Sequence, residues 1–271
     1  MDFKWIAVMV VGIVLALFGM NKQKQGAAWG QALAIVGALI AVAGAIMNMT
    51  NFFQAGSQGM AREKRYMYVQ TKFLGEALKS AASPSKVCVI IDPNNFVDEW
   101  GDELPQPRQS DWLDGVKAGL GSSVEIIPVY PEFHIKKPAN ADQVMPPMPY
   151  TMMGMRDYKK VCEKIKKIKP DAVVNVYQFP MEAPLPIALA ELKGYKIAFL
   201  NTSADRELRA AFQDGGAKGA EVVASVLTKV DAVYDETIPA KDQAAFNRRF
   251  VLATKADFDA KISEASGSAK K

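Results

Sequence analysis

The chain has 271 residues, 49% of them hydrophobic, and a formal net charge of +4. This length allows a membrane segment and one globular domain of about 100–200 residues, and the weak net charge gives no basis for nucleic acid as a partner. The chain has one histidine and two cysteines, Cys88 and Cys162. The cysteines form no CxxC motif, which excludes haem attachment and a zinc ribbon, and we expect no cofactor.

Two apolar stretches without charged residues open the chain. Trp5–Met20 covers about 24 Å as a helix at about 1.5 Å per residue, and Gly26–Met49 is longer. The short connection Asn21–Gln25 is polar, so the pattern predicts a transmembrane helical hairpin over residues 1–53. A cleaved secretory signal followed by one anchor is the alternative.

Basic residues around the two stretches predict their orientation. Lys22 and Lys24 lie in the connection, whereas Lys4, Arg62, Lys64, Arg65 and Lys72 flank the two outer ends. The positive-inside rule then favours a plasma (inner) membrane protein of a bacterium with both ends in the cytoplasm. Neither stretch has an ionisable residue in its interior, which argues against ion transport by this chain alone.

Small residues recur on one face of each apolar stretch. A seven-residue step along a helix returns to nearly the same face, and small residues on such a face let helices pack closely in lipid. These residues are Gly12, Ala16 and Gly19 in the first stretch and Gly30, Ala34, Gly37, Ala41 and Gly44 in the second. They predict a homo-oligomer or docking onto other membrane-protein subunits, or else packing of the two helices within one hairpin.

Residues 54–84 are expected to connect the hairpin to a soluble domain. Thr50–Gly59 is polar and glycine-bearing, which is typical of a short link. Met60–Ala82 has the spacing of an amphipathic helix, which ends before Pro84.

Strand and helix patterns then alternate through residues 85–262, followed by a tail, 263–271, that we expect to be disordered. The predicted strands are Lys86–Ile91, Val124–Val129, Ala172–Tyr177, Lys196–Leu200 and Arg249–Ala253. The predicted helices are Asp111–Leu120, Arg156–Ile168, Ala183–Lys193 and Asp205–Leu227. This alternation predicts an α/β domain with a parallel sheet, Rossmann-like and similar to flavodoxin or to one periplasmic-binding lobe.

A proline- and methionine-rich insertion interrupts this domain over residues 128–155. Long segments without regular structure often bind a partner. The residues expected to contact a partner, a neighbouring subunit or the membrane are Met145, Met148, Tyr150, Met152, Met153 and Met155. Methionine thioethers also suit Cu(I), and local packing is the third alternative.

Polar residues follow the ends of three predicted strands, where open parallel sheets bind their ligands. These candidates are Asp92, Asn94, Asn95, Gln178, Glu182, Asn201, Thr202 and Asp205. Amide and hydroxyl groups dominate this set, which favours hydrogen bonding of a small ligand over acid–base catalysis. Capping of a turn or helix is the alternative for Asp92 and Asn95.

The segment from Gly194 to Leu227, GYKIAFLNTSADRELRAAFQDGGAKGAEVVASVL, resembles the later part of a lobe of the type I periplasmic-binding proteins. In that family a strand, a polar loop and D-x-x-x-x-G recur, and Asp214 and Gly219 have this spacing. The resemblance implies a ligand-binding fold, although the family has two lobes and this chain has room for one.

The ends of two predicted strands also resemble the metal-dependent nucleases of the NYN/PIN type. Asp92-Pro93-Asn94-Asn95 matches D-x-x-N, Ser203-Ala204-Asp205 matches the later acidic turn, and Glu207 would be a further carboxylate. This resemblance implies Mg²⁺ or Mn²⁺ bound by clustered carboxylates that cleave a phosphodiester with activated water. The third strand offers Asn175 and Gln178 where that family has an acid, and Asp171 precedes the strand.

These patterns together predict a non-enzymatic, membrane-anchored subunit that oligomerises through its glycine-rich helices and presents an α/β domain for partner or ligand contact. A small-ligand sensor and an NYN/PIN-like nuclease are the alternatives. The expected partners are the lipid bilayer, further copies of the chain and other membrane-protein subunits.

Overall fold

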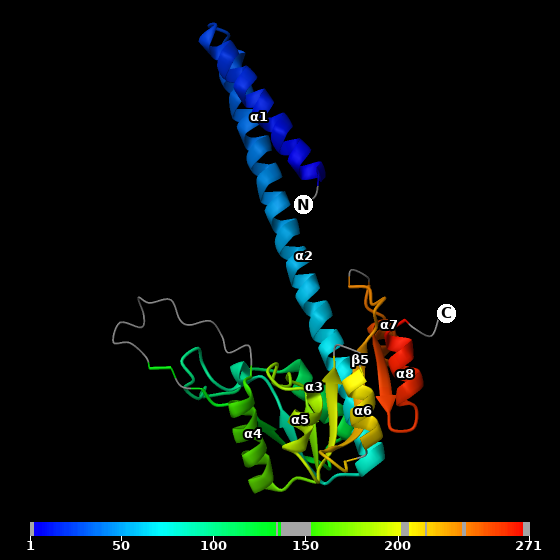
Figure 1. Cartoon of the computed structure of the whole chain (residues 1–271). Coiled ribbons are helices and arrows are strands. Elements are labelled where there is room, and N and C mark those ends of the chain that lie inside the picture. The colour runs from blue at the N-terminus through cyan, green and yellow to red at the C-terminus, as the bar shows by residue number, and fades with distance from the viewer. Residues whose placement is uncertain are drawn as a thin grey trace. The chain divides into compact units, whose positions relative to one another are not determined.

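The computed structural model describes residues 3–133, 135–136, 153–201, 206–214, 216–234 and 237–267, with the backbone alone at residues 3 and 50–58. The chain divides into two compact units, Met1–Glu63 and Lys64–Lys271. The elements of both are labelled in Figure 1.

The first unit is a pair of apolar helices. A turn joins α1 (Phe3–Lys24) to α2 (Trp29–Ala82), and Gly26 in this turn has φ 84°, which glycine adopts without strain. Lys4–Lys24 and Trp29–Met49 are each long and apolar enough to cross a membrane. Only 11% of each stretch is buried, unlike the core helices of soluble proteins.

Helix α2 continues through the segment in which we expected a polar link. The prediction of a link at Thr50–Gly59 is wrong, because α2 is unbroken from Trp29 to Ala82. The segment contains no proline, and its two glycines, Gly56 and Gly59, each cost a helix about 1 kcal/mol without ending it. The predicted amphipathic helix is therefore the last part of α2, whose residues from Lys64 onward belong to the second unit.

Among the described residues, the second unit holds a six-stranded sheet. Its strands are β1 (Lys86–Ile90), β2 (Glu125–Val129), β3 (Ala172–Asn175), β4 (Lys196–Asn201), β5 (Glu221–Thr228) and β6 (Phe250–Thr254). They lie in the order β2-β1-β3-β4-β5-β6, and all neighbours are parallel except β5 and β6. The predicted α/β class with a mainly parallel sheet is confirmed.

Helices cover both faces of this sheet. One face packs against α4 (Met155–Ile168), α5 (Leu185–Ala190), α6 (Arg206–Asp214) and α8 (Phe258–Ala265), which contribute Ile165, Leu189, Phe212 and Ile262 to a buried cluster. The other face packs against the end of α2, α3 (Asp111–Leu120) and α7 (Asp242–Arg249), which contribute Leu74, Leu78, Val116, Leu120 and Phe246. We call the second face the α2 face.

One predicted helix contains a strand instead. The expected helix Asp205–Leu227 is wrong after Asp214, where α6 ends, and Glu221–Thr228 forms β5 at an inner position of the sheet. Gly216, with φ 90°, lies between them. The β-branched sequence EVVASVLT favours a strand, and its burial on both faces removes the alternation that would have identified it.

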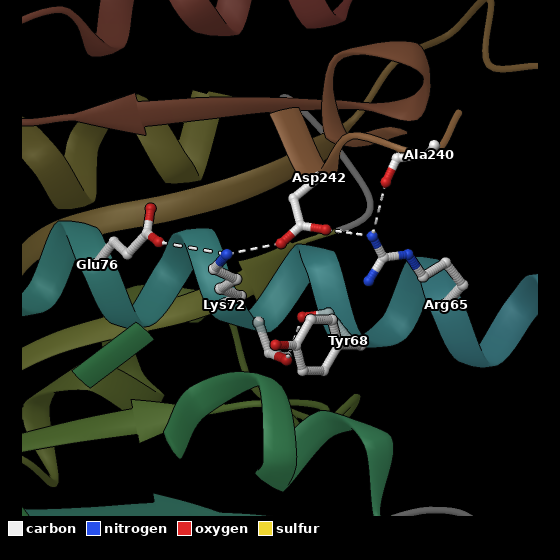
Figure 2. Close-up of polar contacts among 7 residues, drawn as sticks. Arg65, Tyr68, Lys72, Glu76, Ala240 and Asp242 are labelled. Atoms are coloured by element: carbon white, nitrogen blue, oxygen red, sulfur yellow. Dashed lines mark hydrogen bonds and ion pairs between the residues drawn. The ribbon is translucent and has the colours of Figure 1, made fainter. Parts of the chain in front are cut away.

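Charged side chains attach the end of α2 to the first turn of α7 (Figure 2). The Asp242 carboxylate accepts hydrogen bonds from Arg65 and, at 2.6 Å, from Lys72. Arg65 also donates to the carbonyl of Ala240 at 3.4 Å. The Lys72 hydrogen bond, followed by that of Arg65, lowers the pKa of Asp242 despite partial burial. The last turns of α2 are thus an integral part of the α/β unit.

Candidate functional site

The strand order reverses between β1 and β3, because the chain passes from β1 outward to β2 and then returns to pair β3 on the other side of β1. Ligands of open parallel sheets bind at such a point, beyond the carboxyl ends of the strands. The residues that follow β1 and β3 are therefore the first candidates for a site.

After β1, the predicted ligand residues form a local turn. Asp92 precedes a 3₁₀ helix, Pro93–Asn95, and its carboxylate accepts a hydrogen bond from the Asn94 N–H at 2.9 Å. The Asn95 amide donates to the Asp92 carbonyl at 3.4 Å, and Arg108 donates to the Asn94 carbonyl at 3.1 Å. These hydrogen bonds agree with the alternative prediction, in which Asp92 and Asn95 cap a turn or helix. Burial raises the pKa of Asp92, and the hydrogen bond from Asn94 opposes this.

After β3, the buried Asn175 and the partly buried Tyr177 lie beside this turn. Asn175 is fully buried, its Oδ1 accepts the Tyr177 N–H at 3.0 Å, and its Nδ2 has no partner among the described residues. Burial, together with the nearby Asp92 charge, raises the pKa of Tyr177 to about 12. An interaction with the Gln178 side chain opposes this rise in the Tyr177 pKa.

The sequence did not single out Tyr177. The sequence signal for this position is the polar Asn175 inside the apolar run AVVNVY. A protonated phenol and an unpaired amide N–H are hydrogen-bond donors. This corner therefore suits an acceptor group of a small ligand.

The remaining candidates have separate surroundings. Glu182 accepts the Met155 N–H at the start of α4 at 3.3 Å, and Glu207 accepts the Leu185 N–H at the start of α5 at 2.9 Å. Both carboxylates thus satisfy free N–H groups of a first helical turn. Asn201 is the last residue of β4, whereas Thr202 and Asp205 lie outside the described residues.

Carboxylates do not gather at this edge within the described part of the chain. No three His, Cys, Asp or Glu side chains there are placed to hold a metal ion. Asp171 lies at the opposite edge, where its carboxylate accepts from the backbone N–H groups of Ser85 and Lys86 at 2.8 and 2.9 Å. Among the described residues, Asp92 therefore has no neighbouring carboxylates to complete the metal site that the nuclease resemblance implies.

The methionine-rich segment is described only at its end. Met145, Met148, Tyr150 and Met152 lie outside the described residues. Met153 is 2% exposed and Met155 packs partly buried against the same core cluster. The prediction of a partner contact at Met153 is corrected, because its side chain fills the core in this structure.

The glycine-bearing faces of α1 and α2 contact each other. A Cβ added at Gly12 would lie 2.4 Å from the Ala41 nitrogen, and one at Gly37 would lie 2.3 Å from the Ala16 nitrogen. The same closeness holds for Gly19 against Ala34 (2.4 Å) and Gly30 against Gln23 (2.4 Å), and Gly44 faces Met9. The glycine-bearing faces were predicted to pack either within one hairpin or between subunits, and in the structure they pack within one hairpin. Oligomerisation stays a prediction, and it would need other faces of the helices.

Together, these contacts define an α/β sheet unit preceded by two closely packed apolar helices, with a polar corner at the switch point of the sheet. No protein family, curated protein or solved structure matches the chain. The two family resemblances therefore stay predictions.

Proposed function

We propose that this protein is a membrane-anchored, non-enzymatic component of a membrane assembly, in which the helical pair spans the bilayer and the α/β unit contacts a partner. The strand order, which agrees with the flavodoxin-like order of doubly wound sheets, supports a Rossmann-like assignment for that unit.

The observation that carries this proposal is the outer surface of the helical pair. With the glycine faces closed against each other, large aliphatic side chains cover the rest of both helices. Among them, Val14, Leu17 and Leu39 are 57%, 61% and 64% exposed. Continuous apolar surface of this kind is typical of contact with lipid or with another membrane protein.

Two exposed valines in the loop between β5 and α7 of the α/β unit support the partner contact. Val230 and Val233 are 74% and 52% exposed. The loop is fixed by the buried Arg249, which donates to the carbonyls of Val233 and Tyr234 at 3.2 and 3.1 Å. The Arg249 guanidinium also stacks 3.6 Å from the Tyr66 ring centroid and 4.5 Å from that of Tyr234. A loop held in this way presents its apolar side chains at little entropic cost to binding.

The test is the native mass of the tagged full chain after mild detergent extraction, with identification of the proteins that purify with it. We expect the chain to stay in membranes washed with alkaline carbonate and to run above its monomer mass. Val230→Ser with Val233→Ser should reduce the associated partner at least about fivefold, as the loss of about 1 kcal/mol of buried apolar surface predicts. Ile187→Ser, 53% exposed on α5, is the matched control. A monomer without partners would contradict the proposal.

A further inference from the structure

A groove of about 550 Å³ lies on the α2 face of the sheet, at the edge where β4 and β5 begin. Phe73 and Ala77 of α2 form one wall, and Val223 and Leu252 of the strands form the floor. Because the polar corner lies beyond the carboxyl ends of β1 and β3, the groove is at the opposite edge of the sheet. It is therefore a separate site.

The size and lining of the groove suit a small molecule. Binding pockets for small ligands have volumes of about 300–1,000 Å³ and are mostly apolar, with a few polar groups that fix orientation. Phe73 also contacts Phe246 of α7, with ring centroids 4.6 Å apart, so α7 covers the neighbouring part of this face. The groove is thus an open site next to a helix-covered part of the same face.

The charges at the rim indicate which ligand end would bind there. Lys255 and Glu221 neutralise each other at 2.8 Å. Glu76 lies 3.9 Å from Lys72, whose shorter contact, 2.6 Å, is with Asp242. The Lys196 ammonium donates to the Ala81 carbonyl at 3.3 Å and has no carboxylate partner among the described residues. Since an ammonium has three N–H donors, donors remain for an anionic group. Lys196 is the rim charge that a ligand could pair with.

We propose that this groove binds a small apolar molecule with one carboxylate end, such as an aryl carboxylate. Its body lies along Phe73, Ala77, Val223 and Leu252, and its carboxylate pairs with Lys196. A charge-assisted contact of this kind adds to affinity and sets the direction of the ligand, whereas burial of the body supplies most of the binding free energy.

The test uses the full chain in lipid nanodiscs with 2-naphthoate as the probe, its neutral amide as the matched ligand, and empty nanodiscs to subtract partitioning into lipid. Binding is followed by calorimetry and by saturation-transfer NMR. Lys196→Met should weaken naphthoate binding about tenfold, the effect of one charged hydrogen bond, and leave the amide unchanged. Lys79→Met, at an exposed lysine of α2 that does not line the groove, is the control and should change naphthoate affinity less than about threefold.

Ala77→Trp fills the groove and should abolish binding of both ligands. Unchanged unfolding curves for each variant establish that the unit is folded. The proposal is overturned if naphthoate does not bind above empty nanodiscs, if Ala77→Trp binds as the wild type does, or if the two lysine variants weaken binding equally.

Discussion

At the scale of single residues, the carboxylates next to element ends serve the backbone around them. Asp92, Asp171 and Glu182 each accept N–H groups that a turn, a strand start or a helix start leaves unpaired. The same residue types at the same places could bind a ligand or a metal. The sequence therefore located these side chains correctly relative to the strands, and it could not distinguish a cap from a ligand-binding group.

Asp242 differs from them because it joins elements far apart in the chain. Asp242→Asn should lower the free energy of unfolding of the α/β unit by about 1–2 kcal/mol, since Arg65 and Lys72 lose a carboxylate that is only 25% exposed. Urea unfolding of the full chain in nanodiscs, followed through Trp100 and Trp112, measures this change. Asp259→Asn is the control, because its 2.6 Å ion pair with Arg209 involves a 62% exposed side chain and should contribute below about 0.5 kcal/mol.

The pH dependence of this difference follows from the lowered pKa of Asp242. A carboxylate whose folded pKa lies below its unfolded value stabilises the fold fully above the unfolded value, about 4 for aspartate. The gap between wild type and Asp242→Asn should therefore be constant from neutral pH to about pH 5. It should shrink as the pH falls through 4 and below, and a gap that widens on acidification would disprove the assigned ion pairs.

At the scale of elements, short-range patterns located most helices and strands. All five predicted strands are present with ends shifted by a few residues. β5 was missed because Glu221–Thr228 is buried on both sides, so its apolar residues do not alternate. The continuity of α2 was missed because polar residues and glycines predict a link wherever tertiary contacts are unknown.

The sequence also could not decide how α1 packs on α2. A glycine-bearing face can pack against a helix of the same chain or against a helix of another chain. The structure brings Gly44 to 2.9 Å from the Met9 Cγ, measured from an added Cβ. Met9→Cys with Gly44→Cys should therefore form a disulfide within one chain on mild oxidation, seen as faster migration without reducing agent.

The matched control for this prediction is Val10→Cys with Leu39→Cys, two positions that are 53% and 64% exposed. That pair should not cross-link within the chain. If Met9→Cys with Gly44→Cys gives covalent dimers instead, the glycine faces meet between copies and the hairpin packing is wrong.

At the scale of the whole molecule, one helix belongs to both units. α2 begins as an apolar stretch of the first unit and ends in the core of the second, where Val69, Leu74 and Leu78 are fully buried. The α/β unit therefore needs the end of α2 to complete one face of its sheet. We expect that a truncation after the apolar stretches must keep residues from Lys64 onward if the α/β unit is to fold.

We propose that the two apolar stretches of the first unit each cross the membrane, so that the turn between them and the residues from Lys64 onward face opposite sides. Labelling with a membrane-impermeant maleimide tests this most directly, because the natural Cys88 and Cys162 are fully buried and give little background. Gln25→Cys lies in the exposed turn and Lys117→Cys on the exposed side of α3. We predict that intact spheroplasts label Gln25→Cys and that Lys117→Cys reacts only after permeabilisation. Equal labelling of both cysteines from outside, or of neither, would contradict the account.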